Sequence, residues 1–317
     1  MATLATKTLA AINAALEADQ GAKFRGILGT VMPLAGDAYS TKEDKFRSHL
    51  GASIIGRECA REIWYSFHWA TANHFEGRML RLFNRGHLEE PRFVALLLMI
   101  GCEVWQADEN GKQFRISGYR GHYGGSLDAV IRGIPDLPDE PVLGEFKTHG
   151  DKSFQKLKDD GVMSAKWEHF VQMQQYMGKN NLRYALYLAV NKNDDEIYAE
   201  LVAFDQQQYE RYAQRAAMII DTKEAPPKIN QSPGWFKCKF CDHRGVCHDD
   251  SVLPERNCRT CMWSSVADNG EWHCGNPDTR SEADAQGWED PIAIGKEEQL
   301  KGCDRYQVML TQIKAKP

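Results

Sequence analysis

Residues 124–149 read GGSLDAVIRGIPDLPDEPVLGEFKTH, and the prediction of the central sheet rests on them. Two short runs with apolar and β-branched residues, LDAVIRGI and VLGEFKTH, are separated by PDLPDEP, whose prolines and acidic residues are typical of a turn. We therefore predict two neighbouring strands joined by this turn. Asp128 lies at the start of the first strand, and Glu145 and Lys147 lie two residues apart on the second.

Three charged side chains of this stretch form a candidate catalytic group. Side chains two residues apart on a strand project from the same face, so Glu145 and Lys147 point together, and the neighbouring strand can bring Asp128 beside them. Leu143 and Phe146 indicate a buried strand, where charged side chains need a reason. Two carboxylates on one face can hold Mg²⁺ or Mn²⁺, which activates a water and neutralises charge on a phosphodiester. The alternative for an isolated Glu-x-Lys motif is an ordinary surface ion pair.

The flanking sequence predicts helices on both sides of these strands. Apolar periodicity indicates helices over residues 3–19, within 50–83, and over 90–101 with Pro91 in the first turn. Two further strands, RYALYLAV and EIYAELVAF, are joined by the polar turn NKNDD. Helices are also predicted over 151–160, 165–179 and 205–220. This alternation predicts an α/β or mixed α+β sheet with helices on its faces.

Composition limits the classes of protein to which the chain can belong. Its 317 residues suit one large domain or one domain with a smaller module. Mean hydropathy is −0.53 and no apolar run approaches the roughly 18 residues of a membrane span. The first twenty residues lack the features of a secretory signal, so we expect a cytoplasmic protein. A net charge of −5 excludes nucleic-acid binding by overall charge alone, so a nucleic-acid enzyme would need a local basic surface and metal ions.

Seven of the nine cysteines fall in the last 80 residues. In a cytosolic protein such clustering indicates metal binding rather than disulfides. One group is Cys238-x2-Cys241-x5-Cys247. The other is Cys258-x2-Cys261-x12-Cys274 with the more distant Cys303. The second group fits a structural zinc site, in which His273 could replace a ligand, and a second iron–sulfur cluster is the alternative. We expect Cys102 to be an inert core residue.

Two more short motifs accompany the carboxylates. Gln172 and Tyr176 lie four residues apart on one predicted helix face, and RGHLEEP places His87 and Glu90 at a helix start. Each motif alone is more often structural. In their order along the chain, Asp128, Glu145-Phe146-Lys147 and Gln172-x3-Tyr176 resemble the PD-(D/E)XK nuclease superfamily over residues 50–248. The resemblance is to its RecB-like and lambda-exonuclease-like (YqaJ) branches, whose Gly-x3-Glu-Pro motif resembles RGHLEEP.

This resemblance implies a restriction-endonuclease-like central sheet flanked by helices, with a DNA-cleaving site on it. The Mg²⁺ or Mn²⁺ ligands it implies are Asp128, Glu145 and the Phe146 carbonyl, with Glu90 or His87 adding to the shell. It implies that Lys147 positions the attacking water, and that Gln172 and Tyr176 contact the DNA backbone or support Lys147. The sequence departs from the superfamily at Leu127, where a proline usually precedes the aspartate.

The cysteines resemble those of iron–sulfur members of the superfamily, the CRISPR-associated and AddB-type nucleases. In those proteins one cysteine precedes the nuclease core and three follow it. The resemblance implies a 4Fe–4S cluster held by four thiolates, Cys59, Cys238, Cys241 and Cys247. Such a cluster would staple the N-terminal helix to the C-terminal segment. The alternative is zinc on the last three of these cysteines, with His243 or His248 as the fourth ligand.

The sequence thus predicts four regions: a helical region carrying Cys59 (1–85), the nuclease core (86–222), the iron–sulfur segment (223–250), and a cysteine-rich, zinc-binding tail (251–317). The predicted function is a metal-dependent exonuclease on linear DNA ends in recombination or repair, encoded by a bacterium or its phage. A single-strand annealing or other recombination protein is the expected partner, and no membrane is expected. The alternatives are a non-cleaving DNA-binding scaffold, an iron–sulfur redox protein and a CRISPR-adaptation-type nuclease.

Overall fold

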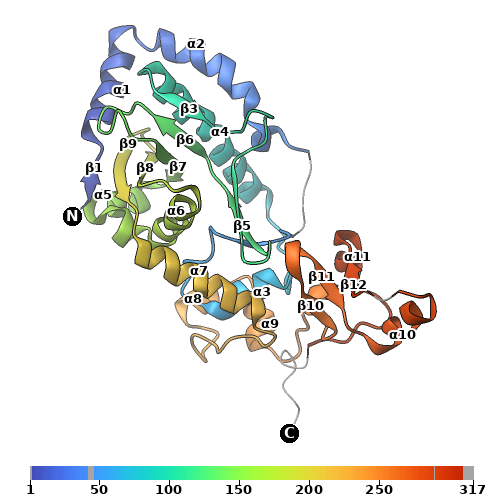
Figure 1. The fold of residues 1–317 in the computed structure, drawn as a ribbon. Coiled ribbons are helices and arrows are strands. Elements are labelled where there is room, and N and C mark those ends of the chain that lie inside the picture. The colour runs from blue at the N-terminus through green and yellow to red at the C-terminus, as the bar shows by residue number, and fades with distance from the viewer. Residues whose placement is uncertain (1, 42–45, 289, 310–317) are drawn as a thin grey trace. The chain divides into compact units, whose positions relative to one another are not determined.

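The computed structural model describes residues 2–41, 46–288 and 290–309 (Figure 1). Its contacts divide the chain into two compact units, and each unit combines segments that are distant in the sequence. Unit 1 consists of Met1–Glu43, Phe75–Ile116 and Gly125–Tyr212, and unit 2 of Asp44–His74, Ser117–Gly124 and Ala213–Pro317. The four-part division along the sequence stays a prediction, and residues 310–317 of its tail lie outside the described residues.

Unit 1 is built on a six-stranded sheet of order β1-β9-β8-β7-β6-β3. Its strands are β1 (Thr3–Leu4), β3 (Glu103–Trp105), β6 (Ala129–Arg132), β7 (Val142–His149), β8 (Tyr184–Asn191) and β9 (Ile197–Ala203). The central strands β7 and β8 are parallel, and the other neighbouring pairs are antiparallel. The predicted mixed α+β class, with a central sheet flanked by helices, is confirmed.

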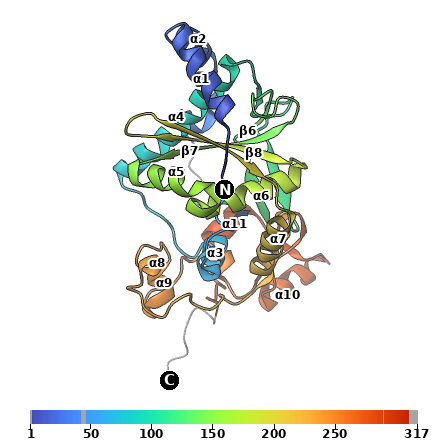
Figure 2. The ribbon, with the colours of Figure 1, turned by 90° about the vertical axis from the view of Figure 1, so that its left-hand side faces the viewer.

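Helices cover both faces of this sheet (Figure 2). One face carries α1 (Thr6–Ala18) and α4 (Gly77–Met99), with α2 (Ala22–Val31) packed on α4, and the other carries α5 (Asp151–Ala165) and α6 (Trp167–Asn180). Phe146 of β7 stacks on Phe93 of α4 at 5.2 Å between ring centroids. Because side chains alternate along a strand, the neighbours Glu145 and Lys147 face α6. The fold therefore separates an apolar face of β7 from a charged one.

A kink in α5 fixes this helix against the sheet. Gly161 has a φ of 73° inside the helix, a conformation that favours glycine, and a Cβ there would lie 2.8 Å from the Ala2 side chain. The break frees the next main-chain donor, and Val162 N donates to Glu200 Oε2 of β9 at 2.8 Å. Tyr198 donates to the same oxygen at 2.5 Å. The buried Glu200 thus satisfies a donor that the kink would otherwise leave without a partner.

Three of the predicted element boundaries are wrong. Residues 20–49, where no helix was predicted, contain α2, and residues 50–83 contain the two-residue strand β2 (Leu50–Gly51), the short α3 (Ala60–Phe67) and the start of α4. The helix expected to begin near Pro91 begins fourteen residues earlier, at Gly77. Packing of α4 on α2 stabilises the added turns, which outweighs the hydrogen bond that proline cannot make.

Unit 2 combines short elements around a buried arginine. They are α8 (Phe236–Lys239), α9 (Arg244–His248), the antiparallel strands β10 (Ser264–Val266), β11 (Trp272–Cys274) and β12 (Ile292–Ile294), α10 (Pro277–Ala285) and α11 (Lys296–Lys301). The guanidinium of Arg259 lies 3.8 Å from the Trp69 ring centroid and 4.7 Å from that of Trp272. It donates to the carbonyls of Ser48 and Phe67. This cation therefore joins two of the three segments of unit 2, Asp44–His74 and Ala213–Pro317.

The remaining elements are β4 (Arg115–Gly118) and β5 (Tyr123–Ser126), which form a small sheet with β2, and α7 (Gln206–Asp221). None of the helices in the described part of the chain has the length and apolar character that crossing a membrane requires.

Candidate active site

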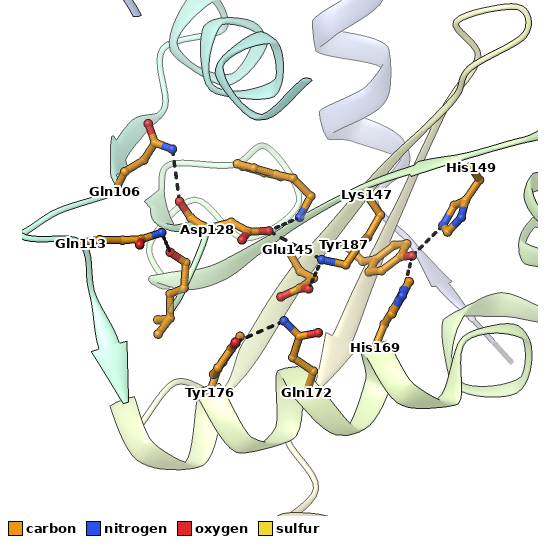
Figure 3. A network of polar contacts seen from close by, with 12 residues as sticks. Gln106, Gln113, Asp128, Glu145, Lys147, His149, His169, Gln172, Tyr176 and Tyr187 are labelled. Atoms are coloured by element: carbon orange, nitrogen blue, oxygen red, sulfur yellow. Dashed lines mark hydrogen bonds and ion pairs between the residues drawn. The ribbon is translucent and has the colours of Figure 1, made fainter. Parts of the chain in front are cut away.

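The register of β6 and β7 brings the predicted carboxylates together in unit 1. Ala129 pairs with Gly144, so one further step along the register places Asp128 opposite Glu145. Asp128 Oδ2 accepts a hydrogen bond from the Phe146 main-chain N at 2.8 Å. Lys147 Nζ lies 4.0 Å from the same oxygen and forms an ion pair with Glu145 (Figure 3). The side chains of Asp128 and Lys147 are 17% and 24% exposed, so the group opens to solvent.

Glu145 is the most deeply buried member of this group, with 0% exposure. Neither carboxylate oxygen accepts a hydrogen bond of normal geometry from the described residues, although Oε1 contacts Lys147 Nζ. Burial, and after it the charge of Asp128, raises the pKa of Glu145 to about 7 against the lowering effect of Lys147. Burial alone would lower the pKa of Lys147, but the two carboxylates outweigh it and raise that pKa. An unsatisfied buried carboxylate is costly unless a ligand completes it.

Glu90 of α4 faces the same group. Burial raises its pKa to about 8, and the next largest cause is the charge of Asp128. His87, one turn earlier, lines a cavity of about 260 Å³ that Glu90 also lines. The charges of Lys147 and Glu145 also act on Glu90. Of the two upstream candidates, Glu90 is therefore the one whose charge is coupled to the carboxylate group.

Asp37 is an acidic neighbour that the sequence analysis did not find. It lies in a 3₁₀ turn, Gly36–Tyr39, lines the cavity that contains Glu90, and its charge also raises the Glu90 pKa. No motif marks it, because it approaches Glu90 only through the packing of the N-terminal segment on α4.

Gln172 and Tyr176 lie on the face of α6 that covers the site. Gln172 Nε2 donates to the Tyr176 hydroxyl at 3.3 Å, and both side chains are buried. Burial raises the pKa of Tyr176, and the charge of Glu145 adds to this effect. Gly125 admits the phenol, because a Cβ there would lie 2.6 Å from the Tyr176 hydroxyl. The structure thus places the side chains of Gln172 and Tyr176 beside the carboxylate group.

Two glutamines hold the loop that carries Asp128. Gln106 Nε2 and Gln113 Nε2 approach the carbonyl oxygens of Asp128 and Leu127, each at 3.4 Å (Figure 3). They line the cavity beside Glu90 as well. The sequence gives no signal for them beyond their position before Asp128.

The first cysteine group converges on one cavity of unit 2. Cys59, Cys238, Cys241 and Cys247 all line this cavity, whose rim carries Arg61, Lys228, Lys237 and Arg244. Cys59 caps α3, and its Sγ accepts from Glu62 N at 3.4 Å. Burial raises the pKa of Cys241 to about 12. The four thiols and the basic rim are chemically suited to an anionic iron–sulfur cluster.

The histidines offered as zinc ligands also line this cavity. His243 Nε2 lies 2.9 Å from the Ser66 hydroxyl, and burial lowers the His243 pKa to about 4. Its Nδ1 is buried without a hydrogen bond from the described residues. Zinc with a histidine ligand therefore stays open beside the cluster.

The second cysteine group gathers around Cys258. Burial raises the Cys258 pKa to about 12, and the next causes are the thiols of Cys303, Cys261 and Cys274. Cys102 lies in the core of unit 1, where burial raises its pKa to about 11. All nine thiols are free. Within residues 2–41, 46–288 and 290–309, no three His, Cys, Asp or Glu side chains stand at the spacing of a formed metal site, so each metal assignment stays a prediction.

Comparisons with known proteins add three partial structural likenesses. No protein-family model matches the chain, and no curated protein matches it. The crystal structure of SSO0001 is 14% identical, with a TM-score of 0.37, over 70% of this chain and 95% of that chain. An alkaline exonuclease, LHK-Exo, from Laribacter hongkongensis is 12% identical, with a TM-score of 0.39, and its complex with dAMP is 13% identical, with a TM-score of 0.38. Both cover 54% of this chain and 86% of that chain.

Proposed function

We propose that the chain is a metal-dependent nuclease that hydrolyses phosphodiesters in DNA. The observation that carries this proposal is the Glu145 carboxylate, which is fully buried, accepts no hydrogen bond of normal geometry from the described residues, and lies beside Asp128 and Lys147. Carboxylate oxygens gathered in this way suit Mg²⁺ or Mn²⁺, and Glu90 lies close enough to interact electrostatically with Asp128 and Glu145.

The residues divide the chemistry among them. Asp128, Glu145 and the Phe146 carbonyl would hold the ion, with Glu90 or His87 beside them. The bound ion would supply Lewis-acid stabilisation of the phosphodiester and a more acidic water. Lys147 keeps its proton next to two carboxylates, so it would orient the attacking water as a hydrogen-bond donor. Gln172 and Tyr176 would support Lys147 or contact the DNA backbone.

We further propose that the enzyme acts on linear DNA ends, and that the cysteine groups bind a 4Fe–4S cluster and zinc. The thiol-lined cavity and the clustering around Cys258 support the two metal assignments. Action in recombination or repair, together with an annealing partner, rests on the resemblance alone. A CRISPR-adaptation role would follow instead if the enzyme cut only short, partly single-stranded substrates.

The test is digestion of end-labelled linear DNA beside a closed circle, using protein purified without oxygen, with Mn²⁺, Mg²⁺ or EDTA. Asp128→Asn and Lys147→Met are compared with Glu140→Gln, a matched carboxylate change at an exposed ion pair with Arg183. Metal-dependent loss of the linear DNA alone, abolished in the first two variants, would support an exonuclease. Cleavage of the circle would indicate an endonuclease. Tight DNA binding without cleavage by metal-loaded protein would favour the non-cleaving scaffold.

A further inference from the structure

A chain of five polar side chains runs beside the carboxylate group, outside every motif of the sequence. Lys166 Nζ contacts Ser153 Oγ, which lies 3.3 Å from His149 Nδ1. His149 Nε2 lies 2.9 Å from the Tyr187 hydroxyl, and that hydroxyl lies 2.8 Å from His169 Nδ1 (Figure 3). This series of hydrogen-bonded side chains borders the site, because Tyr187 is the strand partner of Glu145 and His149 follows Lys147 by two residues.

The donor and acceptor groups of these five side chains allow hydrogen-bond donation in one direction only. An ammonium group can only donate, so Lys166 donates to the Ser153 oxygen, and the Ser153 proton goes to His149 Nδ1. A neutral His149 then carries its proton on Nε2 and donates to Tyr187. The Tyr187 proton goes to His169 Nδ1, which leaves the proton of His169 on Nε2. The reverse direction would leave the Ser153 hydroxyl without an acceptor among these groups.

Both imidazoles must be neutral for this assignment, and their surroundings make them so. Burial, followed by the charges of Lys166 and Lys147, lowers the pKa of His149 to about 4. Burial also lowers the pKa of His169 to about 2, followed by the charge of Lys147. Each imidazole ring therefore carries one N–H proton, as this order of hydrogen-bond donation requires.

The last member of this series, His169, lies on the helix that covers the site. His169 is half-buried and precedes Gln172 by one turn on α6, so it shares the helix face that covers the carboxylates. Its Nδ1 bonds to Tyr187, so its Nε2 points away from that hydroxyl. Within the described part of the chain no hydrogen bond is found to this Nε2. An uncharged N–H donor is thus held in place with no acceptor among the residues that the structure describes.

We infer that His169 binds a non-bridging oxygen of a DNA phosphodiester next to the scissile one, and that Tyr187 is a positioning residue that keeps the Nε2 proton in place. The flanking Lys147 and Lys166 make the surroundings favourable for an anion. The inference rests on the proposed function, since it assigns a backbone contact to the same site.

The experiment measures the binding of labelled linear DNA in Ca²⁺ over a range of salt concentrations, with metal-dependent cleavage recorded for the same proteins. We expect His169→Ala to weaken binding about tenfold, because a hydrogen bond to a charged oxygen is lost. The slope of log Kd against log salt should not change, because a neutral group releases no counterion. The comparison is Lys166→Ala, where loss of a phosphate-binding cation lowers the slope by roughly 0.7–0.9.

Tyr187→Phe supplies the readout for positioning. It frees His169 to carry its proton on Nδ1, which would present a lone pair to the phosphate, so we expect a loss similar to that of His169→Ala. In the double variant the two losses should not add. Ser153→Ala interrupts the chain nearer to solvent and gives the same comparison if the tyrosine variant folds poorly by circular dichroism.

Unchanged binding in His169→Ala, additive losses in the double variant, or a smaller salt slope for His169→Ala would each overturn the inference. In all three cases the wild type would still cleave DNA with Mn²⁺. A wild type that neither binds nor cleaves DNA would instead overturn the proposed function.

Discussion

The buried carboxylate of Glu145 is a feature that lowers the stability of the metal-free protein. A fully buried carboxylate to which no described residue donates a hydrogen bond of normal geometry costs free energy in the metal-free protein. We expect Glu145→Gln to leave the melting temperature in EDTA unchanged or higher, because it removes a buried charge. The same variant should lose at least about 100-fold in cleavage, since a metal ligand supplies several kcal/mol at the transition state.

Thermal melts and single-turnover cleavage check this prediction together, and Glu140→Gln serves as the exposed control. A large fall in stability with activity retained would contradict it, because Glu145 would then be a structural ion-pair partner of Lys147.

Glu90 predicts how stability depends on pH in the metal-free protein. Its folded pKa of about 8 lies above the usual value of 4.5, so its contribution is present at low pH and is lost as pH rises through 8. The buried histidines have lowered pKa values and are already neutral above pH 7. Between pH 7 and 8.5 we therefore expect the melting temperature in EDTA to fall, with a shallower fall in Glu90→Gln. Part of the fall should remain, because the pKa values of Glu89 and Glu145 are raised as well.

Mn²⁺ should reverse this dependence, since a cation favours the ionised carboxylate. Differential scanning calorimetry at several pH values, with EDTA or Mn²⁺, makes the measurement. Equal slopes for the wild type and Glu90→Gln would show that Glu90 does not carry the effect.

For single residues, the sequence predicted correctly those side chains that are brought together by regular spacing along one strand or one helix. The two-residue period of β7 places Glu145 and Lys147 together, and the four-residue spacing of α6 does the same for Gln172 and Tyr176. Asp37 and Tyr187 reach the site through tertiary packing, for which no spacing rule exists. His149 could have been found, because it continues the alternation of β7 beyond Lys147.

Among the elements, the contact of α6 with α7 depends on a glycine. A Cβ at Gly178 would overlap the Tyr209 ring. We expect Gly178→Ala to destabilise the protein by about 1–3 kcal/mol, because the overlap forces side chains or backbone to shift. Gly86→Ala is the matched control, since Gly86 lies in α4 with nothing within 4 Å of the added carbon, and it should be neutral or stabilising by up to about 1 kcal/mol.

Urea denaturation gives both free energies of unfolding. A stable Gly178→Ala protein would show that Tyr209 can turn aside without loss, and the glycine would then have no packing role.

The strands and helices between residues 124 and 221 were predicted well, and so was α1, whereas α2 and the start of α4 were not. β7, β8 and β9 carry continuous apolar and β-branched runs, which specify buried strands locally. The helices α2 and α4 contain glycine or proline and polar stretches, and they persist because each covers the other. Signals that depend on a distant partner cannot be read from a single segment.

For the whole molecule, the two cysteine groups predict how metal content responds to mutation. If the second group binds zinc, Cys258→Ser should lose about one zinc per chain and destabilise the region around that group, because residues 251–309 bury few aliphatic side chains. Cys102→Ala, at a buried thiol outside both groups, should retain all metal. Elemental analysis and hydrogen exchange test this, and unchanged zinc in Cys258→Ser would remove the assignment.

The two residues of β1 have a consequence for handling the protein. Thr3 and Leu4 pair with Leu201 and Glu200, and β1 is the last strand of the sheet on that side. Without it, β9 would present unpaired main-chain groups, and open strand edges recruit further strands. Deletion of residues 2–5 should therefore produce concentration-dependent association visible by light scattering, while a tag at the other terminus should not. The shortest strand of the sheet would then be the one that keeps the chain from joining its own copies.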